Sequence, residues 1–469
     1  MYIKQLYTNC LSEAAYYIED NGEAAIIDPL RDIEPYLELA TGRNARIKYI
    51  FETHFHADFV SGHLDLGQAT GAPIVYGPGT KTKFQALVAK DGELFSVGNL
   101  KIEVLHTPGH TLESTCYLLR DPSGKDHCVF TGDTLFVGDV GRPDLAQKGA
   151  ELTTNDLAGM LYDSIHKKLF PLADGVIVYP AHGPGSSCGK NLGPETHSSI
   201  GEEKQSNYAM KAVSKEDFIS QVTDGITAPP SYFPVNARIN KEGYDSLVKV
   251  LEKGMKEIPA DEFSLLAKED RIILDTRHAD LFMKGFVPGS VSIGLEGRFA
   301  EWAGSLLPFD KPLLLVTDPG KEKETIIRLA RVGFDKINGY LKGGFEAWQA
   351  AGRPIDMIID VDADELMMDL PHDPNLVVVD VRRETEFADG HLKGAVNIPL
   401  QEMTDPGAMA NIEEQHNLYL HCAGGYRSVI AASLLKREGI HNLRNINGGW
   451  ARIKEQEKAE IVKENSVLN

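Results

Sequence analysis

The chain has 469 residues, of which 42% are hydrophobic and 25% charged, values typical of globular proteins. At ~150 residues per domain, this length predicts about three domains. Lys and Arg total 48 against 68 Asp and Glu, which gives a formal charge of −20. Such an excess of negative charge disfavours non-specific binding to nucleic acid or to an anionic membrane, so we expect neither as a partner.

The first twenty residues lack a basic segment followed by an apolar one, the pattern of a secretory signal. No run approaches the ~18 apolar residues that a membrane-spanning helix needs. The cysteines are widely scattered and do not form a disulfide framework: Cys10, Cys116, Cys128, Cys188 and Cys422. These features predict a cytoplasmic protein, and the first three cysteines, beside or within predicted strands, are expected in the core.

Taken in chain order, four predicted strand ends or loops carry His or Asp. They are THFHADFVSGH after the strand 47–51, with His54, His56 and Asp58; HTPGHT, with His110; FTGDT after the strand 128–130, with Asp133; and YPAHG after the strand 176–179, with His182. Imidazole and carboxylate groups gathered in this way suit a metal ion. Scattered surface or core histidines would explain any one motif, but not all four in this order.

These motifs resemble the metallo-β-lactamase superfamily, whose fold is an αββα sandwich, over about half the chain (residues 1–245). The sequence departs from the usual HxHxDH motif because its last position is Phe59. Phenylalanine offers no lone pair, so a second metal site that kept only Asp58 and His182 would be weakened. We therefore expect a mononuclear site, with His63, four residues further on, as a less favoured substitute.

Together with TGDTLFVGDVGRPDL at residues 131–145, the motifs resemble the persulfide dioxygenase branch of the ethylmalonic encephalopathy protein type. The resemblance implies one Fe2+ per chain with the ligands His54, His110 and Asp133. Two imidazoles and one carboxylate on one face of the metal leave positions open for O2 and a substrate sulfur. The remaining motif residues would then orient the ligands and bound water: His56, Asp58 and His182.

The resemblance also gives two residues substrate-binding roles. Arg142, in GRPDL, matches an arginine that faces the glutathione moiety in the family, and an ordinary ion pair is the alternative. Cys188, in HGPGSSCGK, matches a cysteine found in similar fusions, where it could receive or relay sulfur. A buried apolar role for Cys188 is equally compatible with the sequence.

The stretch TAPPSYFPVNARIN, residues 227–240, is rich in proline and turn formers and is expected to end this domain or start a linker. Beyond it, LDTRHADLFMKGFVPGSVSIGL from Leu274 resembles VDVRRETEFADGHLKGAVNIPL from Val379 at an offset of 105 residues. Short apolar runs alternate with helical patterns in both segments. The pattern predicts two α/β domains with parallel sheets, at residues 255–357 and 360–469.

HCAGGYRS, residues 421–428, places Cys422 in a glycine-rich loop between a predicted strand and a helix. The amides of Gly424 and Gly425, the helix N-terminus and Arg427 would favour a thiolate and an anionic persulfide. The loop resembles the rhodanese active loop, and the four residues between Cys and Arg are one fewer than the related phosphatases need. A buried structural cysteine is the alternative.

The first repeat has Thr317 and Glu322 at the positions of Cys422 and Arg427. It therefore lacks both the nucleophile and the cation. We expect this repeat to be catalytically inert and to serve as a spacer or a dimerisation surface, consistent with a homo-oligomer.

The motifs together predict a bifunctional enzyme of hydrogen sulfide metabolism. A non-haem iron persulfide dioxygenase would oxidise a glutathione-type persulfide with O2 to sulfite and thiol. A thiosulfate sulfurtransferase would pass sulfane sulfur through Cys422 to or from sulfite or thiosulfate. Two alternatives are a glyoxalase II-like thioester hydrolase with an attached sulfurtransferase domain, favoured by a dinuclear site, and a persulfide carrier or sensor with a degenerate metal site.

Overall fold

The computed structural model describes residues 1–147, 152–405, 407–408, 412 and 415–464. The chain divides into two compact units. The first comprises Met1–Val248 with Leu329–Gly333, and the second comprises Lys249–Arg328 with Phe334–Asn469. No helix in these described ranges is long and apolar enough to cross a membrane.

The first unit contains two six-stranded sheets. One sheet has the order β1 (Tyr2–Thr8), β2 (Glu13–Asp20), β3 (Glu23–Ile27), β4 (Arg46–Phe51), β5 (Ile74–Tyr76) and β6 (Leu87–Val88). The other has the order β12 (Ser198–Ser199), β11 (Ile177–Pro180), β10 (Asp126–Gly132), β9 (Thr115–Arg120), β8 (Leu100–His106) and β7 (Leu94–Val97).

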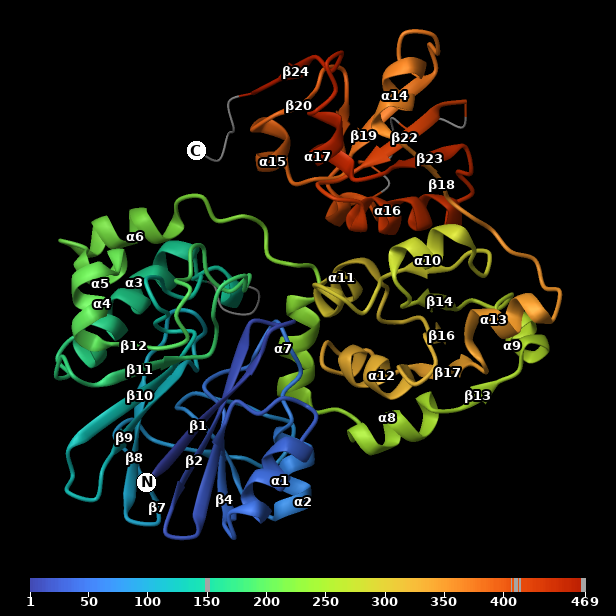
Figure 1. Ribbon diagram of the computed structural model, residues 1–469. Coiled ribbons are helices and arrows are strands. Elements are labelled where there is room, and N and C mark those ends of the chain that lie inside the picture. Colours follow the sequence, from blue (N-terminus) through green and yellow to red (C-terminus); the bar gives the residue numbers. More distant parts are fainter. Residues whose placement is uncertain (148–151, 406, 409–411, 413–414, 465–469) are drawn as a thin grey trace. The chain divides into compact units, whose positions relative to one another are not determined.

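Helices cover the outer face of each sheet, so the first unit is the predicted αββα sandwich (Figure 1). They are α1 (Glu34–Gly42) and α2 (His63–Thr70) on one side, and α3 (Thr154–Ser164), α4 (Ile200–Ser206), α5 (Tyr208–Lys211) and α6 (Lys215–Thr223) on the other. Strand β2 is buried on both faces, and its side chains alternate. Tyr16 and Ile18 pack between the sheets, whereas Ala15 and Tyr17 face the helices.

The strand ends bring the polar motifs together. Strands β10 and β11 are parallel neighbours, so the loops with Asp133 and His182 leave the second sheet at the same edge. Strands β3 and β4 are also parallel, and they place Asp28 and Glu52 side by side at the edge of the first sheet. The predicted strands therefore end where the sequence motifs begin.

The stretch 227–240 is not a linker. Its second half forms most of helix α7 (Phe233–Glu242), and Asn236 and Asn240 are buried within the first unit. Pro234 suits the first turn of the helix because an amide N–H at that position would have no intrahelical acceptor, so proline loses no hydrogen bond there. The expectation that this stretch ends the N-terminal domain agrees with the unit boundary at Val248, whereas the alternative that it starts a linker is wrong: proline here marks the beginning of a packed helix.

The second unit contains two five-stranded parallel sheets with equivalent strand orders. The first repeat has β13 (Glu257–Ile258), β17 (Ile337–Leu341), β16 (Leu313–Val316), β14 (Ile272–Asp275) and β15 (Val291–Ser292). The second has β18 (Ile359–Val361), β23 (Leu443–Ile446), β22 (Asn417–His421), β19 (Leu376–Asp380) and β21 (Val396–Asn397), with β20 (His391–Leu392) and β24 (Ile461–Val462) paired apart.

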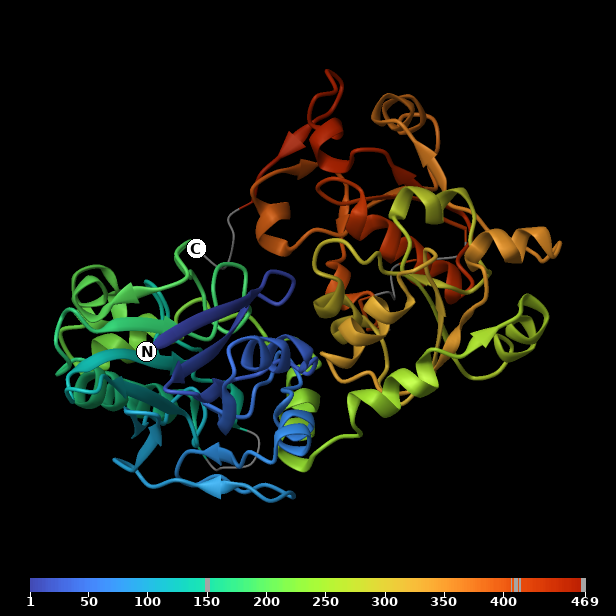
Figure 2. The same ribbon diagram turned by 60° about the horizontal axis from the view of Figure 1, so that its bottom comes forward.

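Helices accompany the sheet of each repeat (Figures 1 and 2). In the first repeat they are α9 (Ala260–Leu266), α10 (Ala279–Lys284), α11 (Phe299–Leu306), α12 (Glu322–Ala330) and α13 (Gly344–Ala350), preceded by α8 (Leu247–Gly254). In the second they are α14 (Ala363–Asp369), α15 (Glu384–Ala388), α16 (Tyr426–Arg437) and α17 (Gly449–Ile453). The two parallel α/β domains expected from the repeat are thus confirmed.

A buried ion pair at the same place in both repeats explains part of the sequence repeat. Arg277 binds Asp275 at 2.6 Å and donates to the carbonyl of Gly285. Arg382 binds Asp380 at 2.5 Å and donates to the carbonyl of Gly390 in the same way. Both arginines also stack on an aromatic ring, with Phe345 and Trp450 at equivalent positions. The DTR and DVR sequences therefore serve the fold.

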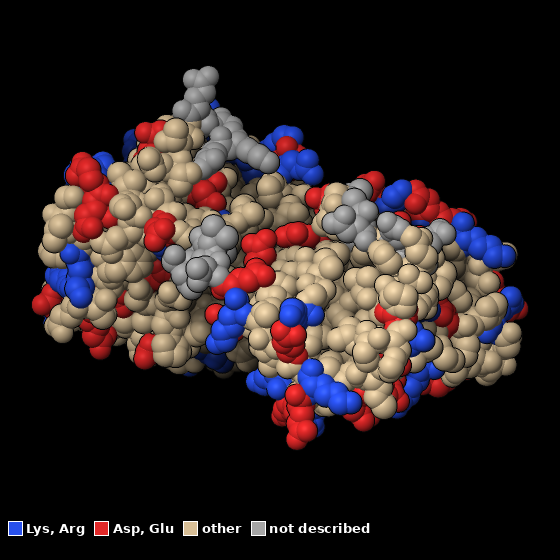
Figure 3. Space-filling view, turned by 90° about the horizontal axis from the view of Figure 1, so that it is seen from above, with Lys and Arg blue, Asp and Glu red and all other residues tan. Residues whose placement is uncertain are grey.

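On the face drawn in Figure 3, basic and acidic side chains are interspersed among uncharged ones. Basic side chains form no continuous patch among the described residues of that face. The view agrees with the formal charge of −20.

Candidate metal centre and sulfur-transfer site

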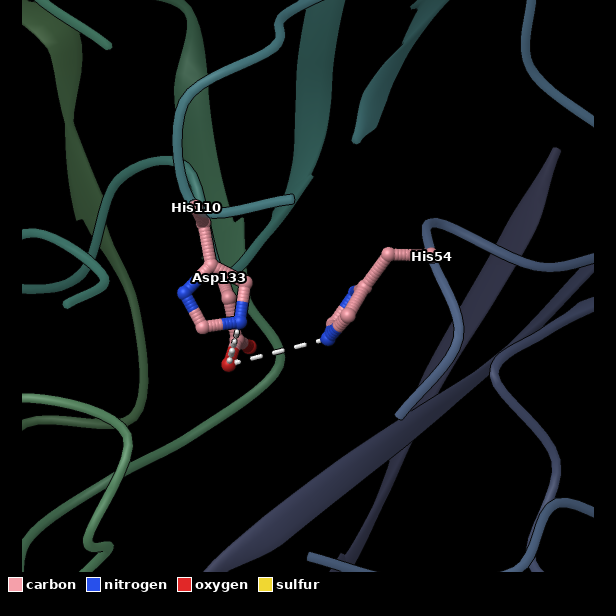
Figure 4. Close-up of side chains that lie close together, drawn as sticks. All are labelled: His54, His110 and Asp133. Atoms are coloured by element: carbon pink, nitrogen blue, oxygen red, sulfur yellow. Dashed lines mark ion pairs between the residues drawn. The ribbon is translucent and has the colours of Figure 1, made fainter. Parts of the chain in front are cut away.

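Three side chains from separate loops of the first unit converge on one point (Figure 4). His54 follows β4, His110 follows β8 and Asp133 follows β10. The Oδ2 atom of Asp133 lies 3.8 Å from Nε2 of His54 and 3.3 Å from Nε2 of His110. All three residues are buried. The structure thus brings together the three residues that the sequence analysis assigned to iron.

The other nitrogen of each imidazole has a partner that fixes the ring. Nδ1 of His110 donates to the carbonyl of Arg142 at 2.9 Å. Nδ1 of His54 lies 2.9 Å from Oγ1 of Thr53, whose hydroxyl donates to Asp28. Because both Nδ1 atoms act as donors, both Nε2 atoms present a lone pair toward Asp133.

The residues present fit a metal ion. Nε2 of His54, Nε2 of His110 and both carboxylate oxygens of Asp133 are buried without a hydrogen-bond partner among the described residues. Unpaired buried polar atoms are costly, and a cation would satisfy all of them at once. Burial and the neighbouring imidazoles of His56 and His110 also lower the pKa of His54 well below 6.5, which keeps it neutral and able to bind metal.

His56 points away from this group. Its Nε2 lies 3.0 Å from Asp28 and 3.5 Å from Glu52, both buried carboxylates. Burial alone would lower the pKa of His56, but the two carboxylates outweigh it and raise that pKa well above 6.5. An imidazolium held between two carboxylates offsets one of their two negative charges, and one donor atom of each of the three residues lies within 4.8 Å of the others. The Nε2 atom of His56 therefore faces a different set of carboxylates from the group of His54, His110 and Asp133.

Asp58 and His182 lie on the other side of Asp133. Nε2 of His182 is 3.4 Å from Oδ1 of Asp133 and 3.5 Å from Oδ2 of Asp58. Cys188 joins these two residues: one donor atom of each lies within 4.8 Å of the others, and all three are buried. Burial and the carboxylates of Asp58 and Asp133 raise the pKa of the Cys188 thiol well above 9.0. The thiol is thus beside the metal centre, but deep in the protein.

Arg142 is engaged by the protein itself. Its guanidinium forms two 2.7 Å hydrogen bonds with Asp144 and donates to the carbonyls of Ser187 and Thr227. Its side chain is 7% exposed. The alternative for Arg142 was an ordinary surface ion pair; the structure shows an ion pair, but a buried one that braces the loop before Cys188. That Arg142 contacts the glutathione moiety of the substrate stays a prediction.

Phe59, at the motif position of the missing histidine, and the nearby His63 supply no metal ligand among the described residues. Phe59 is fully buried, and its ring centroid is 4.3 Å from that of His56. Nδ1 of His63 faces Glu52 at 3.5 Å, while its ring packs beside Phe84. Neither residue joins a group of candidate ligands in the described part of the chain. The structure thus does not bring His63 into the place of the lost histidine.

Sequence reasoning missed three supporting residues. Asp28 and Glu52 follow strands β3 and β4 directly, as the predicted ligands follow theirs, so their position was a usable signal. Asn240 of α7 gave no local signal. Its carboxamide donates to the carbonyls of His56 and Phe59 at 2.8 Å and accepts the amide of Ser61 at 2.9 Å. A residue far along the chain therefore holds the histidine loop in shape.

The N-terminal domain and the two repeats each match a known family. Residues 8–182 match the metallo-β-lactamase superfamily, and residues 259–351 and 362–456 each match the rhodanese-like domain. A solved metallo-β-lactamase from Staphylococcus aureus subsp. aureus COL is 32% identical, with a TM-score of 0.66 over 73% of this chain and 99% of that chain. The chain belongs to the metallo-β-lactamase superfamily through its N-terminal domain. The family matches fall inside the predicted ranges 1–245, 255–357 and 360–469.

Two relatives of the metallo-β-lactamase domain are probable hydroxyacylglutathione hydrolases of Schizosaccharomyces pombe. One is 29% identical over 221 residues, which cover 42% of this chain and 81% of the relative. The other is 34% identical over 161 residues, which cover 34% of this chain and 58% of the relative. The chain thus spans little more than half the length of the second relative.

In the second rhodanese-like domain, Cys422 lies between β22 and α16. The amide of Gly425 donates to its Sγ at 3.1 Å, and the hydroxyl of Ser428 points to the same sulfur at 3.7 Å. Gly425 adopts a φ of +108°, a conformation that favours glycine, and it directly precedes the helix. The helix N-terminus and these donors stabilise negative charge on the sulfur.

Arg427 was expected to favour the Cys422 thiolate. In the structure its guanidinium forms hydrogen bonds of 2.7 and 2.8 Å with Glu386 of α15. Burial alone would raise the pKa of Glu386, but Arg427 outweighs it and lowers that pKa below 4.5. The nearby carboxylate could not have been anticipated from the loop sequence.

A cleft of about 840 Å³ in the second unit is lined by residues of both rhodanese-like domains. Arg427 and Glu386 border it from the second domain, and Arg298 and Lys321 from the first. The hydroxyl of Tyr426 donates to the carbonyl of Gly294 at 3.1 Å across the same region. The first domain, with Thr317 in place of the cysteine, thus forms one wall of the space beside the sulfur-transfer loop.

The remaining cysteines divide into two kinds. Cys116 and Cys128 are fully buried within β9 and β10, as expected for core residues. Cys10 is only partly buried and lies in the turn after β1, so the expectation of a core position is wrong there. The turn places its side chain near the protein surface.

Proposed function

We propose that the chain is a bifunctional enzyme in which a mononuclear non-haem iron persulfide dioxygenase is joined to a sulfurtransferase. The observation that carries the proposal is the convergence of His54, His110 and Asp133, whose metal-facing atoms have no other partner among the described residues. Two imidazoles and one carboxylate are the donor set of non-haem iron oxygenases. The engagement of His56 by Asp28 and Glu52 and the presence of Phe59 support a single metal in this place.

Ferrous iron in this place would supply open positions for O2 and for the terminal sulfur of a persulfide. The chain's own residues hold the geometry. The carbonyl of Arg142 orients His110, and Thr53 with Asp28 orients His54. The substrate would be a glutathione-type persulfide, converted with O2 and water to sulfite and the free thiol.

In the second rhodanese-like domain, Cys422 is the nucleophile. Its thiolate attacks the sulfane sulfur of thiosulfate, a sulfur–sulfur bond forms, and sulfite leaves with the electron pair of the broken bond. In the reverse step sulfite attacks the outer sulfur of the Cys422 persulfide, thiosulfate forms and the Cys422 thiolate leaves. A thiol that attacks the same sulfur is converted to a new persulfide, again with the Cys422 thiolate as leaving group. Gly425 and the start of α16 stabilise the negative charge of both the thiolate and the persulfide.

A thioester hydrolase of the glyoxalase II type is the second candidate, and the names of the two yeast relatives favour it. It would need a metal-bound hydroxide, which a dinuclear site generates more readily than a mononuclear one. The attached rhodanese-like domains favour sulfur chemistry, because the second of them, through Cys422, could transfer sulfane sulfur to the sulfite that a persulfide dioxygenase would form.

Product analysis separates the two candidates. The iron-loaded chain is given glutathione persulfide in one assay and a glutathione thioester in another. The proposal predicts about one sulfite and one thiol formed per O2 consumed, and no thioester cleavage above background. Thioester cleavage with no sulfite from the persulfide would overturn the proposal in favour of the hydrolase.

A further inference from the structure

The cleft beside the sulfur-transfer loop is lined by equivalent parts of the two repeats. The 105-residue offset aligns Lys321 with Tyr426, and both residues line the cleft. The same holds for His278 and Arg383. Lys321 belongs to the loop between β16 and α12, which corresponds to the loop of Cys422 between β22 and α16. The loop that lacks the cysteine and the loop that carries it therefore face one space.

Hydrogen bonds join the two repeats beside this cleft. The hydroxyl of Tyr426 donates to the carbonyl of Gly294 at 3.1 Å, and both residues line the cleft. The amide of Ser292 donates to Oγ of Ser433 at 3.0 Å, and both serines are buried. Walls that are joined in this way keep their spacing before a ligand binds, which lowers the ordering cost of binding.

The cleft is too large for the smallest partners of the sulfur-transfer reaction. Its volume of about 840 Å³ lies in the range of pockets that hold molecules of drug size. Thiosulfate, sulfite and cyanide would each leave most of this volume empty, whereas a tripeptide thiol such as glutathione would occupy a large part of it. The space therefore suits an organic thiol as the sulfur acceptor.

Charged side chains of both signs line the cleft. Arg298 and Lys321 contribute cations from the first repeat, and Asp318 contributes a carboxylate. Arg298 pairs with Glu301 and Lys321 pairs with Glu324, but the two basic side chains remain 40% and 54% exposed. Such exposed pairs are weak and can exchange for a ligand carboxylate. The charges therefore suit an acceptor that carries both carboxylate and ammonium groups.

We propose that the first rhodanese-like domain is the acceptor-binding half of the sulfur-transfer site, in which Arg298 and Lys321 bind the carboxylates of an organic thiol. This inference rests on the proposed sulfur transfer at Cys422. The acceptor loses its thiol proton to solvent, and its thiolate attacks the outer sulfur of the Cys422 persulfide. A new sulfur–sulfur bond forms, and the Cys422 thiolate leaves with the electron pair of the broken bond. The repeat without a nucleophile thus selects the acceptor.

The test compares two acceptors with thiosulfate as the donor, in the full-length chain and without oxygen, so that no dioxygenase reaction consumes the product. Because transfer proceeds through a persulfide on the enzyme, kcat/KM for the acceptor reports only on the second step. We expect the double variant Arg298→Gln and Lys321→Gln to lower kcat/KM for glutathione by roughly 10-fold, since two exposed charge pairs with the ligand are lost. For 2-mercaptoethanol, a thiol without carboxylates, kcat/KM should change by less than about 2-fold.

The double variant Lys342→Gln and Arg353→Gln is the matched control, because both cations lie in the same repeat but do not line the cleft. It should match the wild type with both thiols. An unchanged kcat/KM for glutathione in the cleft variant, or an equal loss with both thiols, would overturn the inference.

Thiocyanate formation from thiosulfate and cyanide separates this failure from failure of the proposed function. If the wild-type chain forms thiocyanate while the cleft variant gives either of those results, the sulfurtransferase stands and only the acceptor site is lost. A folded wild-type chain that transfers sulfur to neither cyanide nor thiol would overturn the sulfurtransferase and the acceptor site together.

Discussion

The carbonyl oxygen of Arg142 accepts a hydrogen bond from Nδ1 of His110 over 2.9 Å. The amide of Arg142 donates to the carbonyl of Cys188. The peptide segment at Arg142 therefore links His110, a candidate iron ligand, to the loop of Cys188. The guanidinium of Arg142 then fastens this segment through Asp144. The orientation of His110 therefore depends on a loop whose sequence shows no metal-binding pattern.

Replacement of His110 by alanine should remove iron from the chain. Two donors remain, so the iron content of protein prepared without oxygen should fall from about one per chain to near zero, and O2 uptake with glutathione persulfide should drop by more than ~100-fold. Iron analysis and an oxygen electrode measure the two effects. His127→Ala, at a partly exposed position on β10, is the control and should change neither. Full O2 uptake in His110→Ala would contradict the ligand assignment.

Asn240→Ala should weaken both the fold and the metal centre. The substitution leaves the carbonyls of His56 and Phe59 and the amide of Ser61 without their partner, at a cost of about 3 kcal/mol. The melting temperature of the metallo-β-lactamase domain should fall by roughly 6–10 °C, and iron should bind more weakly. Calorimetry and iron titration measure these effects. Lys241→Ala, at the exposed neighbouring position, should match the wild type in both.

Cys422→Ser should abolish sulfur transfer and leave O2 uptake largely intact. The serine hydroxyl cannot carry sulfane sulfur, whereas the iron ligands lie in a different domain. A thiosulfate-to-cyanide sulfur-transfer assay and an oxygen electrode measure the two activities on the same sample. If both activities disappeared together in a folded protein, separate sites would be ruled out.

The ion pair between Arg427 and Glu386 should make the second rhodanese-like domain sensitive to acid. Arg427 lowers the pKa of Glu386 below 4.5 in the folded chain, so the pair stabilises the fold fully above pH 4.5. This contribution is lost as the pH falls through the lowered folded value. The melting temperature of Glu386→Gln should lie roughly 1–3 °C below that of the wild type near neutral pH.

The same difference should shrink toward zero as the pH is lowered below 4.5, because the wild-type carboxyl then becomes neutral as well. Melting curves of both proteins between pH 3 and 7 measure it. Glu384→Gln, at the start of the same helix, is the matched control. A difference that stayed constant over this range would show that the pair contributes nothing through its charge.

The sequence allowed prediction of the residues that follow strand ends, because a strand end fixes where the next side chain lies. The motifs that contain His54, His110 and Asp133 were found in this way, whereas the choice of these three as ligands came from the family resemblance. The aligned DTR and DVR segments identified both parallel sheets. Partners brought in by tertiary packing could not be predicted. Asn240 reaches the histidine loop from a helix more than 170 positions away, and Glu386 of α15 lies 41 positions before Arg427 in the sequence.

The central claim is that His54, His110 and Asp133 hold a single catalytic iron. The most direct measurement combines metal analysis of anaerobically purified, full-length chain with O2 consumption on addition of glutathione persulfide. We expect about one iron per chain and one O2 consumed per persulfide. Full iron occupancy without O2 consumption, or two zincs and no iron with rapid thioester cleavage, would contradict it.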